Sequence, residues 1–158
     1  MTNFEPIADQ QFRMESQILP STAVTLRSLC DQEQTTYTEG LRKIVGLHKF
    51  YEDAHAAGSL LIADLSGNLN ELSPPFPTTD VTQTDGVRLS CNASEAFKAY
   101  LDERANPHDE RDLLSFWDVS ANFYADVRAR IERGARIYKL ASLVPPPKVI
   151  ELDFTTLW

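Results

Sequence analysis

Residues 113–127 read LLSFWDVSANFYADV, and the order of apolar and polar residues in this stretch decides the class of fold. Its large apolar side chains recur every three or four residues, which is the spacing of one face of an α-helix. The pattern continues as far as Tyr138, and Pro107 suits the first position of a helix. We therefore predict one long helix over residues 107–143, in which Gly134 is a position of low helix propensity.

A second helical pattern precedes this stretch in the sequence. Apolar residues recur at the same spacing from Tyr37 to Tyr51, which predicts a helix over residues 37–57. Residues 22–34 form either a separate helix or the first part of one long kinked helix, and residues 8–19 predict a short helix. We expect the two long helices to pack antiparallel at the centre of a mainly α helical bundle, with the shorter helices around them.

Residues 59–91 have a different character. The run 60–65 is short and apolar, and a turn signal separates it from a return strand at 69–72, which predicts a β-hairpin. Residues 87–91 alternate as a third strand does, and residues 149–154 are a candidate for a fourth. We predict that these strands form a small β element at one end of the bundle, and an α+β fold is the alternative.

The domain organisation follows from these patterns. We predict a single helical domain over residues 1–144, which carries a strand-and-loop insert at about 59–91 and is followed by an apolar tail, 145–158. Three prolines begin the tail and prevent the long helix from continuing into it. Four apolar residues of the tail are Ile150, Leu152, Phe154 and the terminal Trp158. Because chain ends are usually polar and frayed, we expect these side chains to be buried, in the chain's own sheet beside 60–65 or 87–91, or against a neighbouring subunit.

The composition is that of an acidic globular protein. The 158 residues are 42% hydrophobic and 24% charged, with a net charge of −8 at pH 7. No apolar run approaches the roughly 18 residues that a membrane span needs, and the first residues lack the pattern of a signal peptide. We expect a soluble, cytoplasmic protein without a membrane partner, in which Cys30 and Cys91 are reduced thiols. The acidic balance argues against general nucleic-acid binding.

Acidic and basic residues are segregated in the second half of the chain. Acids dominate residues 102–126, and basic residues dominate 128–139. On one continuous helix, Arg128, Arg136 and Lys139 lie opposite the apolar stripe. We expect these three side chains to contact phosphate or an acidic surface of a protein partner. The alternative is that they pair with the acids that precede them in the chain.

One group of residues has the spacing of metal ligands. His48, Glu52 and His55 share a face of the helix predicted over residues 37–57. Glu-x-x-His is the spacing found in di-iron bundles, and two imidazoles with a carboxylate also suit zinc. The chain lacks a second Glu-x-x-His, and His108 lies at a predicted helix start. We therefore expect no cofactor and interpret the three residues as a solvated polar face, with a metal site as the alternative.

No sequence pattern indicates catalysis. The chain has no Gly-x-Ser-x-Gly, no Cys-x-x-Cys and no glycine-rich phosphate loop. We expect a non-catalytic protein–protein interaction protein (an adaptor, an assembly subunit or an inhibitor) that binds another protein or its own subunits through the tail and the charged helix faces. One alternative is a small helical metalloprotein that uses His48, Glu52 and His55. Another is nucleic-acid binding or mimicry through residues 128–139 or 102–126.

Overall fold

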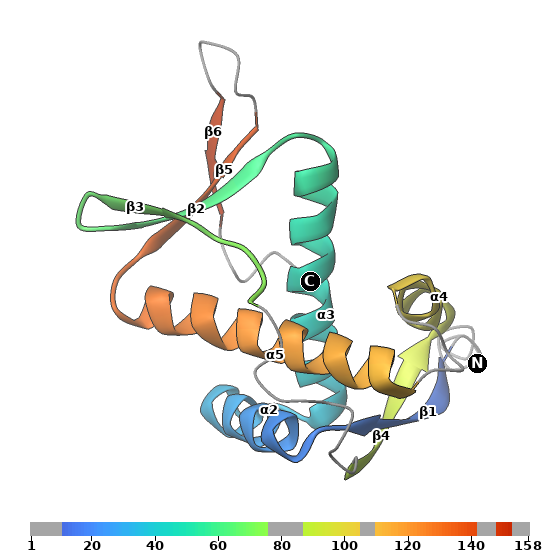
Figure 1. Cartoon of the computed structure of the whole chain (residues 1–158). Helices are drawn as coiled ribbons and strands as arrows, with labels where there is room; N and C mark the ends of the chain where they lie inside the picture. Colours follow the sequence, from blue (N-terminus) through green and yellow to red (C-terminus); the bar gives the residue numbers. More distant parts are fainter. Residues whose placement is uncertain (1–10, 76–86, 105–109, 142–147, 153–158) are drawn as a thin grey trace, which may run out of the picture. The chain divides into compact units, whose positions relative to one another are not determined.

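The computed structural model describes residues 11–75, 87–104, 110–141 and 148–152 (Figure 1). In chain order the elements are β1 (Gln11–Ile18), α2 (Pro20–Glu33), α3 (Tyr37–Ala56), β2 (Leu60–Leu65), β3 (Asn68–Glu71), β4 (Val87–Ser94), α4 (Glu95–Arg104), α5 (Glu110–Glu132), β5 (Arg136–Leu140) and β6 (Val149–Glu151). More of the described residues lie in helices than in strands, which confirms the predicted predominance of helix in part. The fold is mixed α+β, because the strands form two sheets.

The chain divides into two compact units, each made from two segments. Residues 1–42 and 77–119 form the first unit, and residues 43–76 and 120–158 form the second. The long helices α3 and α5 each begin in the first unit and end in the second. Each unit has its own antiparallel sheet: β1 pairs with β4 in the first, and the strands of the second follow the order β3-β2-β5-β6.

The sheet of the first unit ends in the pair Ile18 and Val87. The prediction of a short helix over residues 8–19 is wrong for residues 11–18, because these residues form β1, which pairs with β4 along its whole length. Tertiary pairing of this kind overrides a weak local preference for helix. The strand predicted at 87–91 is confirmed, but its neighbour is β1 and not the predicted hairpin.

A sharp break separates α2 from α3. Gln34 adopts a left-handed conformation, with φ of 53°, at the end of α2, and its N–H donates to the Asp31 carbonyl. The Thr36 hydroxyl accepts a hydrogen bond from the Glu39 N–H at 3.2 Å, which caps the first turn of α3. Of the two predicted alternatives, one kinked helix or two helices, the structure contains two helices.

The two helices approach each other closely at Gly40. A Cβ atom added there would lie 2.7 Å from the Cys30 sulfur, which is closer than ordinary Cβ contacts. Cys30 is buried, and its thiol donates to the Thr36 carbonyl at 3.5 Å. The absence of a side chain at Gly40 therefore permits the packing of α3 against α2.

We predict that Gly40→Ala lowers the free energy of unfolding by about 1–3 kcal/mol, the usual cost of overpacking. This loss outweighs the roughly 1 kcal/mol by which alanine favours a helix over glycine. The measurement is chemical denaturation followed by circular dichroism. In a Cys30→Ala background the obstructing sulfur is absent, so the same substitution should have little effect. A Gly40→Ala protein as stable as the wild type would contradict the close approach.

The second unit contains a four-stranded antiparallel sheet. The predicted hairpin is confirmed: Ser66 and Gly67 form the turn between β2 and β3, with φ of 53° and 89°. Positive φ at both central residues is the requirement of a type I′ turn. Leu61 and Ala63 of β2 are buried, and so is Ile137, which lies opposite Ala63 on β5. One face of this sheet therefore contributes to the core of the unit.

Helix α5 ends at Glu132, so the helix predicted over residues 107–143 is too long at its C-terminal end. Gly134 has a φ of 99°, which glycine adopts without strain. Its N–H donates to the Ile131 carbonyl at 2.9 Å, as at many helix C-termini. The apolar residues beyond this point belong to β5, and they match the helical spacing only by coincidence.

The described part of the tail adds to the sheet of the second unit. Strand β6 pairs antiparallel with β5, so the tail extends the chain's own sheet. Its neighbour is β5, and not 60–65 or 87–91 as predicted. Of the four tail residues expected to be buried, the structure describes Ile150 and Leu152, whereas Phe154 and Trp158 lie outside the described residues.

The predicted antiparallel arrangement of the long helices is wrong within the second unit. There, α3 and α5 meet at His48 with Ser120 and at Tyr51 with Phe123. From the first contact to the second, the residue number increases along both helices. In an antiparallel pair it would increase along one helix and decrease along the other. Helix α3 leads through a short turn into β2, and α5 leads through a short turn into β5. Because β2 and β5 are paired, the sheet determines the directions of the two helices, rather than packing between the helices.

We predict that Gly134→Ala lowers the free energy of unfolding by about 1–2 kcal/mol, because a Cβ atom disfavours the left-handed conformation. No heavy atom lies within 4 Å of the position a Cβ would take, so packing does not contribute. Gly134→Asn is the control, and it should lose less because asparagine tolerates positive φ better than alanine. Urea denaturation compares the two variants, and equal losses would argue against a backbone effect.

Candidate functional site

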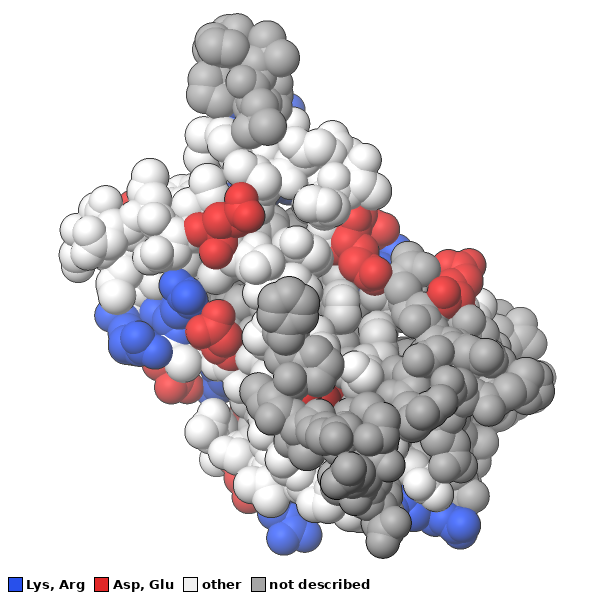
Figure 2. Space-filling view, in the orientation of Figure 1, with Lys and Arg blue, Asp and Glu red and all other residues white. Residues whose placement is uncertain are grey.

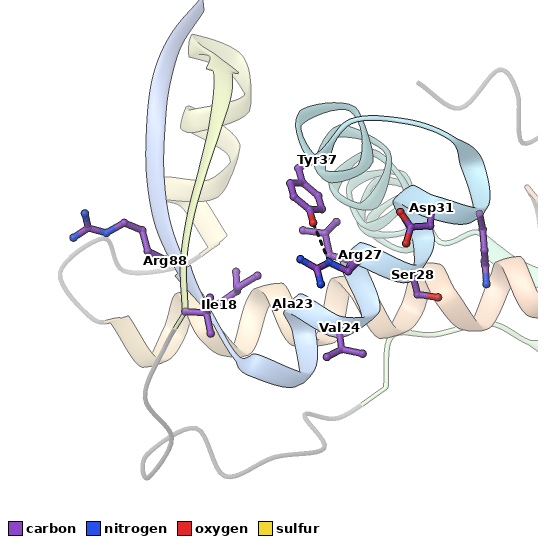
Figure 3. Close-up of a pocket in the computed structure, with 11 residues that line it drawn as sticks. Ile18, Ala23, Val24, Arg27, Ser28, Asp31, Tyr37 and Arg88 are labelled. Carbon is purple, nitrogen blue, oxygen red and sulfur yellow. Dashed lines mark hydrogen bonds between the residues drawn. The ribbon is translucent and has the colours of Figure 1, made fainter.

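A cavity of about 720 Å³ lies in the first unit between α2, the start of α3 and the ends of β1 and β4 (Figure 3). Buried Ile18 and Leu26 form part of its apolar wall. Three exposed apolar side chains also line it: Val24, Tyr37 and Val87, at 71%, 41% and 43% exposure. The rest of the lining consists of smaller and polar residues: Ala23, Arg27, Ser28, Asp31, Gln32 and Arg88. A concave apolar surface with a few polar groups is typical of ligand-binding sites.

The polar groups of the cavity centre on Arg27. Its Nε donates a hydrogen bond to the Tyr37 hydroxyl at 3.4 Å, and the two side chains point toward each other in Figure 3. This hydrogen bond is the main reason why the pKa of Arg27 is raised above its ordinary value, and the charge of Asp31 raises it further. Arg88 points away from the pair in Figure 3. The cavity is therefore lined by an exposed, permanently charged guanidinium that one hydrogen bond links to Tyr37.

The second candidate site is the edge of the larger sheet at β6. No further strand pairs with β6 in the described part of the chain. Two of its side chains are exposed apolar residues, Val149 at 57% and Ile150 at 38%. At the opposite edge, β3 consists of exposed residues of which only Leu69 is apolar. Strand β6 thus combines an open backbone with apolar side chains.

The hydrogen bonds of β6 show which backbone groups face the open edge. A backbone hydrogen bond of 2.8 Å lies at each end of the β5–β6 ladder. The Ala141 N–H donates to the Lys148 carbonyl, and the Leu152 N–H donates to the Ile137 carbonyl. Hydrogen-bonded and non-hydrogen-bonded pairs alternate along an antiparallel ladder, so Ile150 directs its N–H and C=O toward β5. Val149 and Glu151 direct theirs toward the open edge, where an extended segment would meet them.

The basic residues predicted to bind a partner do not form one helical stripe. Arg128 lies on α5, whereas Arg136 and Lys139 lie on β5. Each interacts within the second unit: Arg128 with Glu132 at 3.2 Å, Arg136 with Glu151 at 3.7 Å, and Lys139 with the ring of Phe50 at 5.7 Å. Figure 2 likewise shows Lys and Arg next to Asp and Glu on the face in view, among the described residues. Exposed ion pairs are weak, so these partners do not prevent contact with another protein.

The residues predicted as an alternative metal site are not arranged as ligands. His48 is buried, and its Nδ1 is hydrogen-bonded to the Ser120 hydroxyl. His55 is exposed, and its ring stacks on Tyr51 with 5.7 Å between the ring centres. Glu52 lies between the two histidines on α3 and is half-buried. Within the described residues, no group of three or more His, Cys, Asp or Glu side chains is placed to hold a metal ion.

The His48–Ser120 pair has the residue types of a general base and a nucleophile. Ser120 is 0% exposed and His48 is 9% exposed, so the hydroxyl has no surface on which a substrate could rest. The hydrogen bond instead satisfies two polar groups inside the core, as buried polar groups require. It joins α3 to the part of α5 that belongs to the second unit.

The cavity is not predicted from the sequence, although one signal for it is present. Val24 lies two residues before Leu26, and helix positions separated by two do not face the same way. Because Leu26 and Leu29 are buried, Val24 has to face away from the core. The hydrogen bond between Arg27 and Tyr37 spans the break between two helices, and no spacing rule indicates it.

The fold and the sites together define an α+β protein with an apolar cavity in one unit and an open sheet edge in the other. The chain matches no protein-family model, no curated protein and no solved structure. None of the described helices combines the length and the apolar character that crossing a membrane requires. The chemistry of the two sites is therefore the evidence for function.

We predict that Ser120→Ala lowers the free energy of unfolding by about 1–3 kcal/mol, because it removes a hydrogen-bond partner of the buried His48 ring. Ser115→Ala is the matched control, since Ser115 lies on the same helix and is only half-buried. Thermal and chemical denaturation of both variants measure the difference. If the two substitutions have equal effects, the hydrogen bond does not stabilise the core.

Proposed function

We propose that this protein is a non-catalytic interaction protein and that a partner chain binds along the open edge of β6. The observation that carries the proposal is the backbone of Val149 and Glu151, which faces away from β5. An extended segment that pairs with such an edge gains main-chain hydrogen bonds and contacts alternate side chains. Val149 and Ile150 are both exposed and point to opposite faces of the strand, so each face offers an apolar contact.

The surroundings of β6 support a partner with mixed apolar and charged character. Glu151 shares a face with Val149 and forms an ion pair with Arg136 at 3.7 Å. On this face a partner strand would contact the apolar side chain of Val149 and the Glu151–Arg136 ion pair. Charges at the rim of an interface favour binding of the correct partner over others. The proposed surface also includes the remaining tail and basic residues named from the sequence: Leu152, Phe154, Trp158, Arg128 and Lys139.

The proposal covers an adaptor, an assembly subunit or an inhibitor that acts in the cytoplasm on another protein or on its own subunits. The buried free thiol of Cys30 supports a reducing compartment. Exposed sheet edges are usually blocked by charges, by proline or by a covering element. In β6 the three residues are Val, Ile and Glu, and the prolines of the tail precede the strand. Among the described residues this edge has one charge, no proline and no covering strand, which favours a role in binding.

We predict that Val149→Pro weakens partner binding about tenfold or more, because it removes an N–H that faces the open edge. The hydrogen bonds between β5 and β6 do not use this N–H, so the sheet should persist. Val149→Ala keeps the N–H and is the matched control for the lost side chain. Sedimentation velocity measures self-association, and affinity capture followed by titration of the recovered protein measures binding to another partner.

A third variant checks the direction assigned to each backbone group. Ile150→Pro removes an N–H that faces β5, so it should lower the stability of the second unit, whereas Val149→Pro should not. A Val149→Pro protein that is folded and associates as strongly as the wild type would sink the proposal.

A further inference from the structure

We infer that the cavity of the first unit binds a small molecule with an apolar body and a single carboxylate group. The cavity belongs to a different unit from β6, so this inference does not depend on the proposed partner binding. It rests on the size of the cavity, on its apolar lining and on the position of Arg27.

The size and lining of the cavity suit an apolar ligand. Its volume of about 720 Å³ is within the range in which small-molecule sites are found. Ile18 and Leu26 give the cavity an apolar wall that is part of the core and is therefore preformed. Val24 and Val87 are exposed at 71% and 43%, and a ligand with an apolar body would remove both side chains from water.

Arg27 supplies the polar anchor. Its side chain lines the cavity, and its Nε donates a hydrogen bond to the Tyr37 hydroxyl at 3.4 Å (Figure 3). The terminal nitrogens of a guanidinium form a planar fork that matches the two oxygens of a carboxylate. Because Tyr37 already restrains the side chain, less conformational entropy is lost when a ligand binds.

The charges around Arg27 favour a ligand with one negative charge. Arg88 also lines the cavity, but its side chain points away from Arg27 in Figure 3. Asp31 lies one helical turn beyond Arg27 on α2, and it forms no hydrogen bond with Arg27 among the described residues. A ligand with several phosphates would need several cations directed at it, and the protein as a whole carries a net charge of −8. A monocarboxylate with an apolar body therefore fits better than a nucleotide.

Decanoate and decanol are suitable probes, because they share an apolar chain and differ in charge. Isothermal titration calorimetry of the full chain at pH 7 should show saturable binding of decanoate and weaker binding of decanol. Arg27→Gln should weaken decanoate about tenfold, since a charge-assisted pair is lost, and should leave decanol unchanged. Val24→Asp should weaken both probes, because it places a charge on the apolar lining.

Arg42→Gln is the matched control for the loss of a positive charge. Arg42 is exposed in the same unit, forms an ion pair with Glu39 at 3.0 Å and does not line the cavity. Both probes should bind this variant as they bind the wild type. The inference is overturned if decanoate shows no saturable binding, if Arg27→Gln and Arg42→Gln reduce its affinity equally, or if Val24→Asp leaves both affinities unchanged.

Discussion

The antiparallel pairing of β2 with β5 is the interaction on which the second unit depends. It runs from Leu60 opposite Leu140 to Asp64 opposite Arg136, and it joins two segments that are far apart in the chain. The same pairing places buried Ala63 beside buried Ile137, so backbone hydrogen bonds and apolar burial reinforce each other. Strand β6 pairs only with β5 among the described strands, so the open edge proposed to bind a partner exists because this pair forms.

In the first unit the comparable constraint is the break between α2 and α3. The left-handed turn at Gln34 ends one helix, and the Thr36 cap begins the next within three residues. This short reversal brings Tyr37 back to Arg27, and the close approach at Gly40 keeps the two helices together. The cavity is therefore a product of local helix capping, and its anchoring cation is oriented by the same turn.

Local signals made part of this structure predictable. The hairpin turn at Ser66 and Gly67 and the helix from Tyr37 depend on nearby residues, and both are confirmed. Strand β1 depends on β4, which lies far along the chain, so its own residues do not reveal it. The prediction for the end of α5 is wrong for a different reason: low helix propensity alone does not end a helix, whereas the positive φ of Gly134 ends α5 and allows β5 to begin. Of the two candidate sites, the sequence indicates the tail as an apolar segment. It does not indicate the neighbour of β6, because that neighbour is β5, whose residues match a helical pattern.

The polar residues whose spacing suggests binding indicate a binding site less clearly than the apolar residues outside the core do. His48 is hydrogen-bonded to Ser120, and Arg128 is paired with Glu132, so both find partners within the chain. A polar side chain can be satisfied by its neighbours or by water, whereas an exposed apolar side chain leaves water only through contact with another molecule. Single exposed apolar residues are common and carry no argument by themselves. Val24 and Val149 differ from that background because each belongs to a candidate site that also contains a directed polar group: the Arg27 guanidinium in one case and an outward-facing backbone in the other. A binding site combines exposed apolar side chains with polar groups that are oriented toward a ligand, and a single exposed apolar residue elsewhere on the surface lacks this combination.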